Sequence, residues 1–279
     1  MKPIKPATFR SSDLENFVWE NISFGREIKQ FLLRIGADFP SVVLAYSADL
    51  GAGIIAEKVA VEVSKLGINV FLSQDASPIS ALSLGLVQRE MPMGLYLSKK
   101  DDNIFRLYPL AAHGGPVDWF EGEDFSLAPR SPNGVVGKTE LLGPYVQQLS
   151  GLVDTNFEYS KKLSGIDSPF LALENFFRQY GDLKIFYQFE SGCPRAIIDS
   201  EGQILRIEKI PGEVVPAREI VQTIGKYLIK TRRANGTILC PEGTRQFITD
   251  WGTPYEVSGE ALDMSHQATY SDLLLGWWE

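Results

Sequence analysis

Few side chains in this sequence have types and spacings that could bind a metal or attack a substrate. There are two histidines, His113 and His266, and two cysteines, Cys193 and Cys240, and neither pair has the spacing of a zinc motif. Both cysteines flank apolar, strand-like sequence, which favours buried free thiols. Asp101-Asp102-Asn103 could begin a calcium loop, but the loop's glycine and its distal glutamate are missing. These residues alone predict no metal site.

One segment has part of the pattern of a phosphate-binding loop. Gly134–Thr139 ends in Gly-Lys-Thr, as a nucleotide-binding P-loop does. Pro132 stands at the position of the loop's first glycine, and no long buried strand leads into the segment. We therefore expect no nucleotide to bind there.

Composition and charge exclude several classes of partner. The net charge is −8 without long charged runs, whereas a nucleic-acid surface needs clustered lysines and arginines; one small basic pocket is still compatible with it. No stretch reaches the ~18 apolar residues of a membrane helix, and residues 1–6 contain no apolar signal core. We therefore expect a cytoplasmic protein, long enough for two modest α/β domains or one large one.

The first half of the chain alternates between apolar strands and amphipathic helices. Strands are expected at 41–46, 68–72, 93–97 and 104–108, and helices carrying Ile55, Val59 and Val63, or Leu82 and Leu86, separate the first three. This order implies right-handed crossovers and a mostly parallel sheet. Residues 109–133, rich in glycine, proline and acidic residues, are expected to form a long surface loop before a connecting helix over 139–153.

The second half predicts another α/β unit. Residues 154–182 show a helical patch and no strand; the patch consists of Phe170, Leu173, Phe176 and Phe177. From Leu183 on, strands are expected at 184–189, 195–199, 203–207, 236–240 and 254–257, with helices around Ile220–Leu228 and from Tyr270. Ser200-Glu201-Gly202 supplies the glycine that a hairpin turn between the second and third of these strands requires.

Six segments, taken in chain order, match motifs of a known enzyme superfamily. They are Val42–Asp49, Ala76–Leu82, Gly94–Asn103, Ile197–Leu205, Glu256–Glu260 and Ala268–Leu275. In this order they resemble the phosphohexomutases, the superfamily of phosphoglucomutases and phosphomannomutases. Gly94–Asn103 holds the place of the family's phosphoserine loop, and Glu256–Glu260 that of its sugar-reading loop.

The resemblance implies a fold and a domain plan. We expect an α/β protein with two phosphohexomutase-like domains, whose mixed, mostly parallel sheets carry helices on both faces. Residues 1–138 would correspond to the family's first domain, 139–182 to a connector helix and a remnant of the second, and 183–279 to the third. We expect no counterpart of the family's fourth, phosphate-binding domain.

The same resemblance implies that the catalytic residues have been lost. Lys100 stands at the position of the family's phosphoserine and Asp101 at that of its histidine, so the loop Ser98-Lys99-Lys100-Asp101 is degenerate and no catalytic residue is assigned. The family's magnesium loop falls on Glu190–Arg195, which offers one carboxylate instead of three. Asp49 replaces an arginine, and Glu260 a histidine. We therefore expect neither a metal nor another cofactor.

Several cations persist around the former cleft. The resemblance assigns substrate-binding positions to Arg10, Lys100, Arg106, Arg195, Glu256 and Ser258. Arg10, Lys99, Lys100, Arg106 and Arg195 could converge on its mouth as a retained anion pocket. The alternative is that they are ordinary solvated surface residues.

The leading expectation is a phosphohexomutase-like pseudoenzyme that acts by binding a partner protein or a phosphosugar. The alternatives are a residual or altered phosphosugar mutase with Ser98 as phosphoacceptor, and an assembly protein with no small ligand. Because aromatic residues lie near both points where the family's domains are shortened, we also expect self-association or a protein partner. These are the Phe170–Phe177 patch and Trp277-Trp278.

Overall fold

The computed structural model describes residues 2–3, 7–11, 41–115, 118–119, 133–150, 165–173, 175, 195–202, 205–210, 212–216, 238–240 and 255–257. The chain divides into two compact units. The first comprises Met1–Tyr145 with Ser200–Gly202, and the second Val146–Asp199 with Gln203–Glu279. In the described part of the chain, no helix has the length and apolar character needed to cross a membrane.

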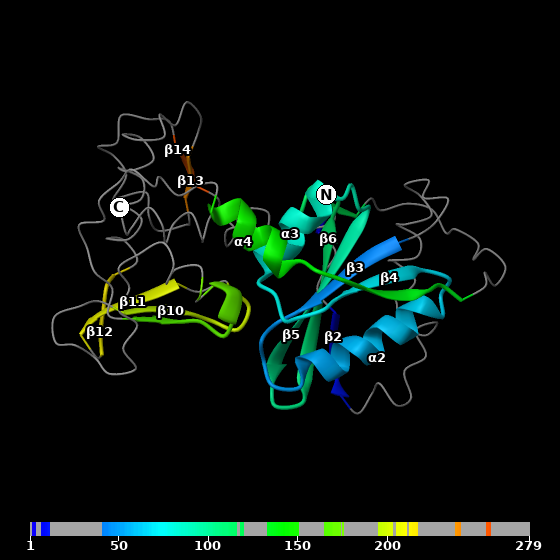
Figure 1. The fold of residues 1–279 in the computed structure, drawn as a ribbon, viewed down its shortest axis with the longest axis horizontal. Coiled ribbons are helices and arrows are strands. Elements are labelled where there is room, and N and C mark those ends of the chain that lie inside the picture. Colours follow the sequence, from blue (N-terminus) through cyan, green and yellow to red (C-terminus); the bar gives the residue numbers. More distant parts are fainter. Residues whose placement is uncertain are drawn as a thin grey trace. The chain divides into compact units, whose positions relative to one another are not determined.

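A six-stranded mixed sheet forms the first unit (Figure 1). Its strands, in spatial order, are β2 (Ala7–Arg10), β6 (Ile104–Ala111), β5 (Met93–Asp101), β3 (Ser41–Tyr46), β4 (Asn69–Ser73) and β8 (Val136–Thr139). The neighbours from β5 to β8 are parallel, and β6 is antiparallel to both β5 and β2. Lys2–Pro3 (β1) and Asp118–Trp119 (β7) form a separate antiparallel pair.

Helices cover both faces of this sheet, as the sequence predicts. Helix α2 (Ala52–Ser64) packs on apolar side chains that alternate along the three central strands. They are Val42 and Leu44 of β3, Val70 and Leu72 of β4, and Leu95 and Leu97 of β5. Helix α3 (Ile79–Gln88) lies on the opposite face, where a Cβ atom added to Gly94 would lie 2.7 Å from the Leu86 side chain.

The second unit contains a four-stranded sheet in the order β12-β11-β10-β9. Its strands are β9 (Gly165–Asp167), β10 (Arg195–Ile198), β11 (Leu205–Ile210) and β12 (Glu213–Val214). The predicted hairpin is β10 with β11, and Gly202 in its turn has the positive φ of 70° that favours glycine. β13 (Ile238–Cys240) and β14 (Tyr255–Val257) pair in parallel, and α4 spans Leu142–Ser150.

Three expectations about individual elements were wrong. A strand, β9, lies inside 154–182; it has no apolar run of its own and exists because it pairs in parallel with β10. The expected loop over 109–133 begins with the last three residues of β6 and contains β7. β8 was not predicted, and the helix expected from residue 139 begins at Leu142. The expected strand at 184–189 and the helices around 220–228 and after 270 lie outside the described residues.

The P-loop-like segment is a sheet strand with a structural need for glycine. A Cβ atom at Gly134 would lie 2.0 Å from the carbonyl oxygen of Ile68, so no other residue fits there. The Gly134 N–H donates to the Ser64 carbonyl at 2.8 Å, and Val136–Thr139 then pair with β4. Gly134 thus lets two segments of backbone come together, and Gly137 is an ordinary residue of β8.

Candidate functional site

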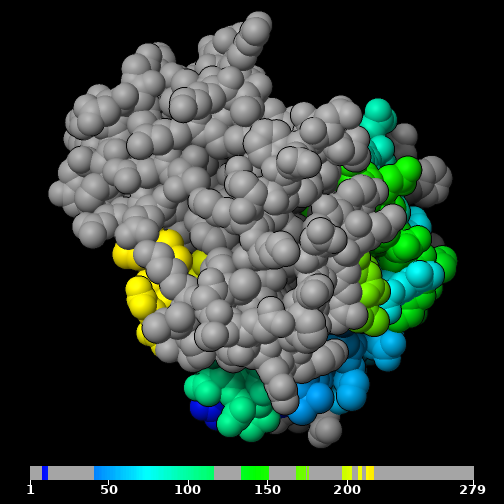
Figure 2. Space-filling model, turned by 60° about the vertical axis from the view of Figure 1, so that its left-hand side comes forward, coloured from blue at the N-terminus to red at the C-terminus, as the bar shows by residue number. Residues whose placement is uncertain are grey.

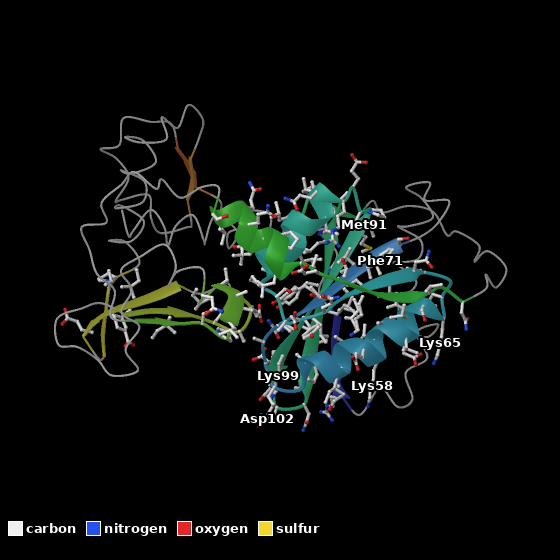
Figure 3. The ribbon with its side chains drawn as sticks, viewed as in Figure 1. Lys58, Lys65, Phe71, Met91, Lys99 and Asp102 are labelled. Carbon is white, nitrogen blue, oxygen red and sulfur yellow. The ribbon has the colours of Figure 1, made fainter. Side chains whose placement is uncertain are left out.

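The segment that resembles the phosphoserine loop is a closed β-hairpin. β5 runs on to Asp101, a turn at Asp102 and Asn103 reverses the chain, and β6 returns from Ile104. The Asp102 N–H donates to the Asp101 carboxylate at 2.9 Å, which stabilises the turn. Lys99 and Asp102 lie close together at the tip (Figure 3), where Nζ and Oδ1 are 3.5 Å apart.

Ser98 lies in the regular part of this hairpin and is fully buried. It pairs with Arg106 of β6, its side chain is 0% exposed, and its hydroxyl oxygen has no hydrogen-bond partner among the described residues. The side chains of Lys100 and Asp101, further toward the tip, are exposed. The buried residue is thus the serine, and the exposed ones are a lysine and an aspartate.

The carboxyl end of β3 meets this hairpin through Asp49. The Ser47 N–H donates to the Leu97 carbonyl at 2.9 Å, which ends the β3–β5 ladder. Beyond this point the Asp49 carboxylate accepts two hydrogen bonds on Oδ2. One comes from the Ser47 hydroxyl at 2.7 Å and the other from the Lys99 N–H at 3.4 Å. Asp49, at the position of an arginine in the phosphohexomutases, therefore binds the protein's own backbone.

Buried hydroxyls also fill the end of β4 and the start of α3. Ser73 and Ser77 are 1% and 0% exposed, their Oγ atoms are 3.1 Å apart, and both bond the Asp75 carbonyl. The Tyr96 hydroxyl donates to the Ser77 carbonyl at 2.9 Å. Ser200–Gly202, the turn residues that belong to the first unit, lie at the same edge of the sheet. The Ser200 carbonyl there accepts the Ala48 N–H at 2.8 Å. Parallel sheets commonly bind ligands at this edge.

Two of the predicted cations share one face of the sheet. Thr8 pairs with Arg106, and Arg106 with Ser98, so these three side chains lie in one row across β2, β6 and β5. Arg10, two residues beyond Thr8, lies on the same face, opposite the face that α2 covers. Arg106 is half-buried, and its Nη1 lies 3.4 Å from the Tyr108 hydroxyl. In Figure 2 the dark blue surface of β2 lies beside the teal surface of the hairpin.

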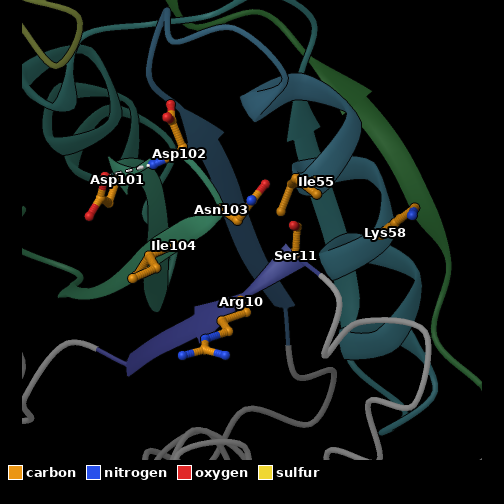
Figure 4. A pocket seen from close by; sticks show the side chains of 8 residues that line it. All are labelled: Arg10, Ser11, Ile55, Lys58, Asp101, Asp102, Asn103 and Ile104. Carbon is orange, nitrogen blue, oxygen red and sulfur yellow. Dashed lines mark hydrogen bonds between the residues drawn. The ribbon is translucent and has the colours of Figure 1, made fainter.

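A hollow of about 700 Å³ opens at the hairpin tip. Its walls are Arg10 and Ser11 from the end of β2, Ile55 and Lys58 from α2, and the hairpin residues Asp101–Ile104. Ser11 and Asn103 lie near Ile55 in its middle, whereas Arg10 and Lys58 point in different directions (Figure 4). The two cations of this hollow therefore do not converge on one anion.

The remaining predicted site residues belong to the second unit. Arg195 begins β10 and Glu256 is the middle residue of β14. Ser258, the metal-loop residues Glu190–Pro194 and Trp277-Trp278 lie outside the described residues. Of the aromatic patch, Phe170 and Leu173 are 2% and 3% exposed. Those two side chains therefore offer no free surface.

The donor set at Glu190–Arg195 does not fit Mg²⁺, because one carboxylate supplies too few hard oxygen ligands for a dedicated site. In the described segments no three potential metal ligands come together.

Tyr46, at the end of β3, has a pKa raised above its ordinary value by burial and by the nearby carboxylates Asp75 and Glu57. This tyrosine stays neutral at neutral pH, and its hydroxyl donates to the Gln74 carbonyl at 3.2 Å.

Sequence reasoning missed the residues that complete this edge. Ser47, Ser73 and Tyr96 look like ordinary strand residues in the sequence, and only the structure shows their hydrogen bonds to Asp49, Asp75 and Ser77. The sequence identifies Asp49 as the replacement of an arginine, but it contains no pattern that predicts the contact of Asp49 with Lys99. A serine immediately after each of two buried strand cores is the one pattern that could have pointed to them.

Comparisons with known proteins relate this architecture to mutases at the level of structure. No protein-family model matches the sequence, and no curated protein matches it either. A protein described as a putative phosphomannomutase, from Thermus thermophilus, matches with a TM-score of 0.71 and 14% identity, over 99% of this chain and 80% of that one.

Two further structures match almost as completely. A phosphoglucomutase/phosphomannomutase family protein from Burkholderia thailandensis has a TM-score of 0.63 and 10% identity, over 98% of this chain and 68% of that one. The phosphoglucomutase parafusin from Paramecium, in its open form, has a TM-score of 0.64 and 11% identity, over 98% of this chain and 71% of that one. The chain therefore has a phosphohexomutase-like α/β fold.

Proposed function

We propose that this protein is a non-catalytic phosphohexomutase homologue that binds a phosphosugar or a similar anion without transferring its phosphoryl group. The observation that carries the proposal is the state of Ser98, whose hydroxyl is fully buried inside β5. Lys100 stands where the resemblance expects the phosphoserine, and a lysine cannot serve as that phosphocarrier. A mutase that used Ser98 instead would have to bring this hydroxyl into solvent.

The binding half of the proposal is supported by the row of side chains beside Ser98. Arg106 lies between Ser98 and Thr8, and Arg10 follows on the same face of the sheet. A guanidinium group offers several N–H donors in a plane and binds phosphate oxygens in pairs. Thr8 and Arg10 are exposed, so a ligand can approach this row from solvent.

A protein partner, or a second copy of the chain, is the second candidate. Leu50 and Ile54 favour it, because these large apolar side chains are 92% and 65% exposed; Leu50 lies in the turn before α2, and Ile54 lies in its first turn. A contact there would remove apolar area from water.

An activity assay and a binding assay test the two halves separately. With glucose 1-phosphate or mannose 1-phosphate and Mg²⁺, we expect no mutase turnover; turnover that Ser98→Ala abolishes would contradict the non-catalytic half. In a thermal-shift assay the same sugar phosphates should raise the melting temperature, because they bind the native state alone. Arg106→Gln and Arg10→Gln should each reduce that shift. Lys65→Gln, a surface change at the C-cap of α2, is the control and should leave it intact.

A further inference from the structure

β5 extends beyond the end of its neighbour β3. The last pair of the ladder is Tyr46 with Leu97. In a parallel ladder the next N–H of β5 that faces β3 belongs to Lys99. This N–H donates to the Asp49 carboxylate, with Lys99 N and Asp49 Oδ2 3.4 Å apart. A side chain thus takes the place of a strand carbonyl at the point where β3 has ended.

The carboxylate is itself held in position. The Ser47 hydroxyl donates to the same Oδ2 atom at 2.7 Å, and Ser47 is 1% exposed. The Ser47 N–H is fixed in turn on the Leu97 carbonyl. Asp49 is therefore anchored to the end of β3 and reaches across to β5.

The other side of β5 is irregular at the same place. Ser98 and Lys99 pair in register with Arg106 and Phe105, but the register then shifts between Lys99 and Asp101. A bulge disrupts the ladder locally and leaves a residue unpaired. The tip of the hairpin thus has a weakened ladder toward β6, and the Asp49 carboxylate is its contact toward β3.

We propose that Asp49 is a clasp that holds the tip of the β5–β6 hairpin closed and thereby keeps the neighbouring Ser98 hydroxyl buried. The contact is intramolecular, and it does not depend on whether the protein binds a phosphosugar. Opening the clasp would free the Lys99 N–H and let β5 separate from its neighbours from the tip inward. Ser98, one residue further in, is the first buried side chain that such opening would expose.

Thiol labelling at Ser98 tests the clasp directly. Ser98→Cys places a thiol at the buried position, and peptide mass spectrometry distinguishes its alkylation by iodoacetamide from that of Cys193 and Cys240. We expect slow labelling with Asp49 present and labelling at least about tenfold faster in the Asp49→Ala background, because hydrogen bonds to charged groups are the stronger ones. Asp49→Asn, which keeps an acceptor oxygen without the charge, should give an intermediate rate.

Two controls separate local opening from general loss of stability. Asp75→Ala removes an exposed carboxylate at the end of β4 and should leave labelling slow. The hydroxyls of Ser73 and Ser77 donate to the Asp75 backbone carbonyl, which this substitution keeps. Hydrogen exchange at the Leu95 amide, in the centre of β5, should be unchanged by Asp49→Ala while exchange at Lys99 accelerates. Equal labelling with and without Asp49 would overturn the proposal, and so would acceleration at Leu95 equal to that at Lys99. If the alanine variant does not fold, the asparagine variant decides between the same outcomes.

Discussion

The middle of the parallel strands and their carboxyl ends are equally buried but are built from different chemistry. In the middle, Leu44 and Leu95 are 0% exposed and pack among other apolar side chains. At the ends, Ser47 and Ser73 are 1% exposed and are held by hydrogen bonds. Apolar packing stabilises in proportion to buried area, whereas an internal hydrogen bond gains little over one to water. The middle therefore carries the stability of the first unit, and the ends can change at small cost.

Truncation in the middle should have the largest effect. Leu44→Ala should lower the free energy of unfolding by about 3 kcal/mol, through lost apolar transfer energy and the cavity left behind. Leu50→Ala is the matched control, because Leu50 is 92% exposed, and should change stability by less than about 0.5 kcal/mol. Chemical denaturation measures both. Similar losses for the two variants would show that the first unit is not stabilised mainly by this core.

At the polar edge, removal of a satisfied hydroxyl should cost less. Tyr96→Phe deletes the donor that lies 2.9 Å from the Ser77 carbonyl and should destabilise by about 1–2 kcal/mol. Tyr108→Phe is the control on the neighbouring strand, since among the described residues its hydroxyl makes only a long contact of 3.4 Å with Arg106. That variant should lie within about 0.5 kcal/mol of the wild type. A larger loss for Tyr108 than for Tyr96 would contradict the ranking.

Ser98 should respond with the opposite sign to the other edge residues. Its hydroxyl is buried without a partner among the described residues, so Ser98→Ala removes a desolvation penalty and should stabilise the protein by about 1 kcal/mol. Ser47→Ala, which deletes the donor to Asp49, should destabilise it instead. Thermal and chemical denaturation of the two variants give the signs. A loss on Ser98→Ala would mean that this hydroxyl has a partner.

The smallest effect should appear only at alkaline pH. The pKa of Tyr46 is raised above its ordinary value of 10.0, first by burial and then by Asp75 and Glu57. The folded state therefore retains the phenol proton more firmly than the unfolded state does. This contribution is complete below about pH 10 and is lost as the pH rises through the folded pKa. Tyr46→Phe should reduce the decline in unfolding free energy between neutral pH and about pH 11, and an unchanged decline would exclude Tyr46 as its source.

How much of this architecture could be predicted depended on where each residue's partners lie. β3, β4 and β5 were found because each is an apolar run long enough to be recognised by itself. β9 is three residues, Gly165–Asp167, and becomes a strand only through its pairing with β10. β8 follows Gly134 in the segment that resembles a phosphate loop, and the reason for this glycine lies in the carbonyl of Ile68, far away in the sequence.

The candidate site could likewise be predicted only in part from the sequence. The replacement of a phosphoserine by Lys100 and of an arginine by Asp49 could be inferred from the motifs alone. The burial of Ser98 could not, because it depends on pairing with Arg106 across a hairpin whose tip contains a bulge. The contact of Asp49 with the Lys99 N–H depends on the different lengths of β3 and β5.

The phosphorylation state of Ser98 tests the central claim most directly. The protein is purified from its native host, its intact mass is measured, and the peptide that contains Ser98 is sequenced by mass spectrometry before and after incubation with glucose 1-phosphate and Mg²⁺. A buried hydroxyl on a closed hairpin cannot exchange a phosphoryl group, so we expect this peptide to be unmodified in both samples. Phosphate on Ser98 that appears or disappears with the sugar phosphate would contradict the account, because the serine would then be a working phosphocarrier.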